Sequence, residues 1–150
     1  RRRPPAPFFG RCVCESAARV PRPSLQPSEE AAMHRTATHL TRDVQDAIDE
    51  CQHCHSICVA TIRHCLDLGG RHAEAGHITL MSDCAQVCTM AANFMLRNSR
   101  FQKQITGLCA QVCHACADDC ERLDGEDRMM RECAEACRRC ASFCERIPAA

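Results

Sequence analysis

The sequence predicts an all-α protein, an antiparallel up-down-up-down four-helix bundle with a cysteine-lined core. Proline is absent from Ser28 to Ile147, and turn-forming residues interrupt that stretch at 69–70, 98–99 and 124–125. Each of the four segments that remain carries cysteines at helical spacing. Four helices joined by short loops pack most simply as a bundle in which neighbours run antiparallel.

Residues at the segment ends indicate where the helices begin and end. We expect the first helix to start within residues 28–41. Ser99 and Gln102 form an S-x-x-Q capping box that predicts the start of the third helix. Gly125 is expected to end that helix, and Asp127 suits the first turn of the fourth.

The N-terminal segment differs in composition from the rest of the chain. Six of the seven prolines precede Ser28, which predicts an irregular tail over residues 1–32 and a bundle domain over residues 33–150. The tail is interpreted either as an unstructured extension or as sequence upstream of a true start at Met33. Cys12 and Cys14 lie in it and are assigned no role.

Charge and hydropathy exclude several classes of protein. The formal net charge is zero, so nothing indicates a nucleic-acid or anionic-membrane partner. No run of 18 apolar residues exists, which argues against a transmembrane helix. Charged residues interrupt the N-terminal segment, which argues against a secretion signal. We therefore expect a cytoplasmic protein whose thiols are kept reduced.

Cysteine replaces ordinary core residues in the predicted domain. The chain has 16 Cys, no Trp, no Tyr and five Phe. Only 20 Leu, Ile, Val and Phe occur in residues 33–150, against 14 Cys. A buried cysteine packs as a small hydrophobe, so the core is expected to be built largely from thiols.

One phrase, C-x3-C-x2-C-x3-C, recurs once per predicted helix. Residues 109–123 and 133–147 both carry it whole and are identical at eight of 15 positions. Residues 84–98 keep its first two cysteines and place Ala91 and Met95 in the other slots. Residues 54–68 keep three cysteines, with Thr61 in the third slot, and Cys51 lies one turn earlier.

Helical geometry gathers each phrase onto one face. Offsets of 0, 4, 7 and 11 fall within a narrow arc at about 100° per residue, so each phrase is a stripe that we expect to face inward. His77 falls near the centre of its stripe, with Met81 beside it, and Met129 and Met130 flank the fourth stripe. The candidate metal ligands are Cys51, Cys54, Cys58, Cys65, Cys84, Cys88, Cys109, Cys113, Cys116, Cys120, Cys133, Cys137, Cys140, Cys144, His77, Met81, Met129 and Met130.

A core of thiols favours a soft monovalent ion. Thiolate and thioether ligands suit Cu(I), zinc and iron–sulfur clusters. No lysine or arginine lies on the stripes, and uncompensated buried charge is very costly. One Cu(I) per thiolate leaves the core neutral, whereas Zn(II) in four-thiolate sites leaves two negative charges per ion. Many Cu(I) ions per chain are therefore expected, and a zinc or iron–sulfur protein stays as the alternative.

Two other interpretations of the cysteines fit the sequence less well. The even count of bundle cysteines permits a disulfide set, but C-x3-C along one helix gives poor disulfide geometry. A thiol redox sensor needs one or two exposed thiols of low pKa, not fourteen. No carboxylate dyad, Ser-His-Asp set or nucleotide loop indicates an enzyme.

The C-x3-C phrases on four consecutive helices resemble the bacterial copper storage proteins, particularly their cytosolic branch. The resemblance covers roughly residues 34–147. It implies a bundle that holds many Cu(I) ions, assembled as a homotetramer, with copper ions and copper chaperones as partners. It also implies one end fitted with His and Met, and Thr61, Ala91 and Met95 depart from the pattern.

Topology predicts which end of the bundle that is. The turns at 69–70 and 124–125 lie at one end, called the mouth here, together with Cys65, His72, His77, Met81, Cys120, Met129, Met130 and Cys133. Ions are expected to enter there and pass from imidazole and thioether to thiolate. The opposite end, called the far end, is expected to be closed by Leu40, Val44, Ile105 and Ile147. His53, His64 and His114 are expected on the surface, and His55 flanks its stripe.

Overall fold

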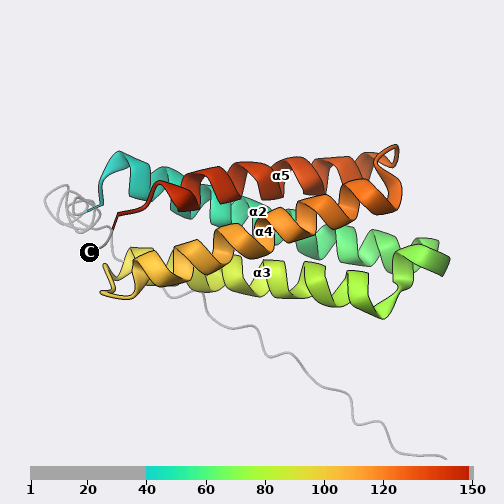
Figure 1. The fold of residues 1–150 in the computed structure, drawn as a ribbon, viewed down its shortest axis with the longest axis horizontal. Helices are drawn as coiled ribbons and strands as arrows, with labels where there is room; N and C mark the ends of the chain where they lie inside the picture. Colours follow the sequence, from blue (N-terminus) through green and yellow to red (C-terminus); the bar gives the residue numbers. More distant parts are fainter. Residues whose placement is uncertain (1–39, 149–150) are drawn as a thin grey trace, which may run out of the picture. The chain divides into compact units, whose positions relative to one another are not determined.

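The computed structural model describes residues 40–148 as an antiparallel bundle of four long helices. These are α2 (Arg42–Leu68), α3 (Ala75–Leu96), α4 (Gln102–Asp124) and α5 (Arg128–Glu145), with a short 3₁₀ turn η1 (Gly70–Ala73) between α2 and α3. Each helix packs against the next in sequence, and α2 also packs against α5 (Figure 1). The predicted fold class is confirmed. The tail, Met33, Cys12 and Cys14 lie outside the described residues, so the predicted domain boundary stays a prediction.

The first helix begins at Arg42, one residue after the predicted range, and its N-cap is the last residue of that range. Thr41 is its N-cap, and the Thr41 hydroxyl accepts a hydrogen bond from the Val44 amide at 3.4 Å. The helix ends at Gly69, whose N–H donates to the Cys65 carbonyl. Gly69 and Gly70 have φ values of 72° and 56°, a region that costs glycine little. This turn sends the chain back along the bundle, as the sequence predicts.

The capping box predicted at Ser99 and Gln102 is wrong. The N-cap of α4 is Phe101, without a side-chain cap. The Ser99 hydroxyl accepts instead from the Phe101 amide at 3.3 Å. The buried side-chain amide of Gln102 donates to the Pro148 carbonyl at 3.4 Å. A tertiary acceptor at the end of the chain has therefore replaced the local reciprocal bond.

The turn between α4 and α5 falls at Gly125 as predicted, whereas Asp127 is the N-cap of α5 rather than a residue of its first turn. Gly125 is the C-cap of α4, in an ordinary right-handed conformation. Its lack of a side chain matters because an added Cβ would lie 3.3 Å from the Glu121 carbonyl oxygen. Asp127 is the N-cap of α5, and its carboxylate accepts from the Met130 amide at 3.0 Å.

Small side chains allow the four helices to approach closely. Alanines alternate with cysteines on the inward faces and are almost fully buried, among them Ala47, Ala91, Ala117, Ala136 and Ala141. Because neither residue type is bulky, sulfur atoms from different helices come together near the bundle axis. In residues 40–148 no helix combines the length and the apolar composition needed to cross a membrane.

Candidate metal centre

Every bundle cysteine faces the core, as the stripes predict. All fourteen have a relative accessibility of 0% and are free thiols. The structural disulfide set considered from the sequence is thus not formed. These fourteen side chains, Cys51 to Cys144, are called the thiol column below.

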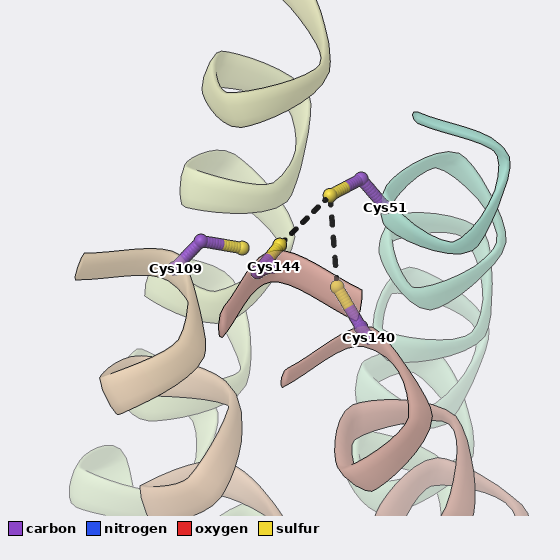
Figure 2. Close-up of side chains that lie close together, drawn as sticks. All are labelled: Cys51, Cys109, Cys140 and Cys144. Atoms are coloured by element: carbon purple, nitrogen blue, oxygen red, sulfur yellow. Dashed lines mark hydrogen bonds between the residues drawn. The ribbon is translucent and has the colours of Figure 1, made fainter. Parts of the chain in front are cut away.

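The thiols nearest the far end form a compact group drawn from three helices. Figure 2 shows Cys51 of α2, Cys109 of α4, and Cys140 and Cys144 of α5 with their sulfur atoms pointing toward one another. The Cys51 sulfur lies 3.5 Å from that of Cys144 and 3.7 Å from that of Cys140. All four sulfur atoms lie within 4.8 Å of one another.

Four more such groups run along the axis and share members. The sulfurs of Cys84 and Cys113 are 3.6 Å apart, as are those of Cys88 and Cys113. Overlap of this kind makes one continuous column rather than separate four-ligand sites. The further groups are Cys54, Cys84, Cys88 and Cys113; Cys54, Cys58, Cys84 and Cys137; Cys58, Cys116, Cys133 and Cys137; and Cys88, Cys109, Cys113 and Cys140.

No lysine or arginine is buried with the column among the described residues. The buried thiols therefore have one another as hydrogen-bond partners. Hydrogen bonds with neighbouring thiols, together with burial, raise the pKa of Cys58 and Cys137. Hydrogen bonds from neighbouring thiols lower the pKa of Cys54 and Cys133 against the opposing effect of burial. Because no lysine or arginine is buried beside these thiols in residues 40–148, each ligand that deprotonates on binding metal can be balanced by one monovalent cation.

At the mouth the donors are of three kinds. The Cys65 sulfur lies 3.5 Å from Nε2 of His77 and 3.5 Å from the Met130 sulfur. His77 is 4% exposed, and Met130 and Met81 are fully buried. Burial raises the pKa of Cys65 to about 11. Met129 is only half-buried, so of the four predicted His and Met ligands it lies nearest to water.

An aspartate that sequence reasoning missed holds the histidine. Nδ1 of His77 lies 2.6 Å from Oδ2 of Asp119, and the other carboxylate oxygen accepts from Arg122. Burial alone would raise the pKa of Asp119, but hydrogen bonds from His77 and Arg122 outweigh it and hold the pKa below its usual value. The available signal was its place beside Cys120, at the edge of the third stripe.

The comparisons with known proteins agree with this geometry. A family model described as copper storage protein matches residues 40–149. The chain belongs to the copper storage protein family. This is a family of storage proteins rather than enzymes, and its function is copper storage.

The chain is also similar to solved structures. It is 46% identical to the Nmul_A1745 protein of Nitrosospira multiformis, covering 69% of this chain and 93% of that one with a TM-score of 0.64. It is 33% identical to the Cu(I)-bound copper storage protein 3 of Bacillus subtilis, covering 73% of this chain and 100% of that one with a TM-score of 0.66. The uncharacterized cysteine-rich protein YhjQ of B. subtilis strain 168 is 35% identical over 77 residues, 51% of this chain and 71% of that protein.

Within this copper storage fold the slots without cysteine are filled by other buried side chains. Thr61, Ala91 and Met95 have no accessible surface. The Thr61 hydroxyl donates to the Ile57 carbonyl one turn earlier, so it points back to its own helix. Each of these slots interrupts a stripe without opening the core to water.

The far end is closed by apolar side chains, as predicted. Val44, Ile48 and Ile147 are all buried there. Leu40 and Ile105 are partly buried and pack against the core. The far group of thiols therefore borders apolar side chains on the side away from the mouth.

The remaining histidines lie outside the column. His53 is exposed, and His64 and His114 pair with Asp127 and Glu145 at 3.1 and 2.9 Å, which confirms their predicted placement away from the core. Nδ1 of His55 lies 3.0 Å from the Ala85 carbonyl. The histidine at 72, predicted at the mouth, lies 3.5 Å from Asp124 there.

Proposed function

We propose that this chain stores Cu(I) along the thiol column, with its fourteen cysteines as ligands. The observation that carries the proposal is the set of five overlapping four-thiol groups, fully buried and without a buried lysine or arginine. Soft thiolates match Cu(I), and at about one ion per thiolate the core stays neutral. The expected capacity is on the order of ten or more Cu(I) ions per chain.

The overlap of the groups favours Cu(I) over zinc. A structural Zn(II) site is closed by four ligands of its own. Here Cys54, Cys88, Cys113 and Cys137 each belong to two groups, so neighbouring tetrahedral sites would compete for the same sulfurs. Each Zn(II) bound by four thiolates would also add two negative charges to a core that has no cation to balance them.

We assign His77, Met81, Met129 and Met130 to the mouth, as neutral donors that pass Cu(I) to Cys65. The contacts of Cys65 with His77 and Met130, both at 3.5 Å, support this assignment. Neutral nitrogen and thioether donors hold the ion without adding charge, which suits a site of transit. The buried thiols beyond them suit a site of retention.

We further propose that the protein is a cytoplasmic homotetramer supplied by copper chaperones. The support is the resemblance to the cytosolic branch of the family and a column of thiols that must stay reduced to bind metal. Sedimentation of the metal-free and loaded protein tests the assembly, and a monomer in both states would contradict it. Fractionation of cells expressing the full chain tests the location.

Anaerobic titration of the reduced protein with Cu(I), against a chromophoric chelator, tests storage directly. We expect uptake to continue to about one ion per thiolate, and a plateau at roughly one to four ions, the size of a structural metal site, would contradict storage. Zn(II) under the same conditions should saturate far earlier. Brown colour after reconstitution with iron and sulfide would favour the iron–sulfur alternative.

Substitution within the column tests the ligands. Cys113 and Cys137 each belong to two groups, so replacing both by Ala should lower the copper capacity while far-ultraviolet circular dichroism shows the helices intact. Unchanged stoichiometry in the folded variant would count against the column as the store.

A further inference from the structure

We propose that Asp119 is a positioning residue for copper transfer: it holds His77 so that Nε2 of the imidazole faces Cys65 with a free lone pair. The inference rests on the proposed storage function and adds to it a residue that is not itself a ligand. It concerns the step in which an ion moves from the mouth into the thiol column.

The contacts form a short chain that leads inward from the surface. Arg122 donates to Oδ1 of Asp119, Oδ2 of Asp119 meets Nδ1 of His77 at 2.6 Å, and Nε2 of His77 lies 3.5 Å from the Cys65 sulfur. The exposed fraction of the side chain falls from 69% at Arg122 to 17% at Asp119 and 2% at His77. The imidazole is therefore fixed between a carboxylate on α4 and a thiol on α2.

The chemistry of the carboxylate selects one tautomer. An ionised carboxylate only accepts hydrogen bonds, whereas a neutral imidazole has one N–H and one bare nitrogen. The proton must then lie on Nδ1, and Nε2 keeps the lone pair that a metal needs. Partners of this kind fix the ring orientation of metal-binding histidines and raise their basicity. When Cu(I) moves on to Cys65 it stays monovalent, and the thiol proton leaves to water.

Two similar pairs at the same end lack this geometry. His64 meets Asp127 and His72 meets Asp124, at 3.1 and 3.5 Å. Neither has a hydrogen-bond contact with a thiol among the described residues. Asp124 therefore offers a matched control, because its carboxylate also joins a histidine across the loops of the mouth.

Asp119→Asn is the informative variant, because the hydrogen bond from Arg122 fixes the orientation of the new side-chain amide. Its oxygen must accept from Arg122, which leaves the NH2 group facing Nδ1 of His77. Nδ1 then has to accept, so the proton moves to Nε2 and the lone pair facing Cys65 is lost. A wrong tautomer in intact geometry is known to disable a histidine in enzymes. Asp119→Glu keeps a carboxylate and should recover part of the function.

The experiment measures the rate of uptake of the first Cu(I) equivalents from a chromophoric chelator. The variants are D119N, D119E, D124N, H77A and the H77A D119N double mutant. ¹⁵N spectra of the histidines in the metal-free proteins report the tautomer. We expect D119N to slow uptake by about tenfold, the scale of outer-shell changes, and to move the His77 proton to Nε2. D124N should match the wild type, and D119E should lie between.

The double mutant separates positioning from packing. If Asp119 acts through His77, D119N adds nothing in the H77A background. Equal uptake by D119N and wild type, or a further loss in the double mutant, would overturn the inference. Total copper capacity reports the storage function separately, and in D119N, D119E and D124N, which keep every proposed ligand, it should match the wild type.

Discussion

The mouth and the far end of the bundle are built from the same helices but present different donors. Near the far end, Cys51 and three other thiols converge, with Ile48 and Ile147 buried beyond them. At the mouth Cys65 meets the imidazole of His77 and a methionine sulfur. The first arrangement suits retention of a soft ion and the second suits its transfer. The two arrangements lie at opposite ends of one column.

The largest expected effect is stabilisation by copper, and it should be uneven along the bundle. A ligand that binds only the folded state adds about 4 kcal/mol when its free concentration is 1,000 times Kd. Loading should therefore raise the melting temperature well above that of the metal-free protein. Hydrogen exchange should slow more around Cys51 and Cys144 than around Cys65. Equal melting temperatures of the loaded and metal-free protein, or equal protection from hydrogen exchange at both ends, would contradict a difference between the two ends.

Replacing Ile48 by Ala at the far end should lower the free energy of unfolding by nearly as much, and it removes no metal ligand. Ile48 is 1% exposed, and Ile→Ala in a core typically costs about 2–5 kcal/mol. Replacing the half-buried Met129 at the mouth by Ala should lower the free energy of unfolding much less. Urea unfolding of the two metal-free variants measures the difference. A similar loss in both would mean that the far end is no more tightly closed than the mouth.

Exchanging one sulfur for oxygen at each end should separate transfer from retention. Cys65→Ser should slow the uptake of Cu(I) by roughly tenfold while leaving most of the capacity in place. Cys144→Ser should lower the capacity and leave the initial rate unchanged. Stopped-flow uptake and end-point stoichiometry measure the two quantities. The opposite pattern would place the route of uptake at the far end.

The smallest effect concerns pH and the thiol at the mouth. Burial raises the pKa of Cys65 from its ordinary value of 9.0 to about 11, so folding favours its protonated form. That contribution is complete below about pH 9 and is lost as pH rises through 11. Metal-free protein should lose stability over this window, and Cys65→Ser should lose less. If the two metal-free proteins lose stability identically with pH, Cys65 is not the cause of the loss.

Much of the fold and of the site follows from local pattern. The stripes C-x3-C-x2-C-x3-C identify the inward face of each helix. The turns at 69–70 and 124–125 bring Cys65 and His77 to one end of the bundle. Thr41 and Asp127 cap their helices through local contacts. The stripes and the turns depend on residues close along the chain, so the sequence suffices to predict them. The caps are less well determined, because the sequence bounds the start of the first helix only to residues 28–41 and places Asp127 in the first turn of the fourth.

The sequence by itself determined four helices and fourteen inward thiols, because helical periodicity is a local property. Only the tertiary structure decided which thiols share a group, since the register between helices depends on how closely their alanines pack. It also decided two polar contacts between distant segments. Gln102 donates to Pro148 rather than capping its helix, and Asp119 meets His77 across two helices. A buried polar group takes the partner that packing brings to it, and no spacing along the chain records that partner.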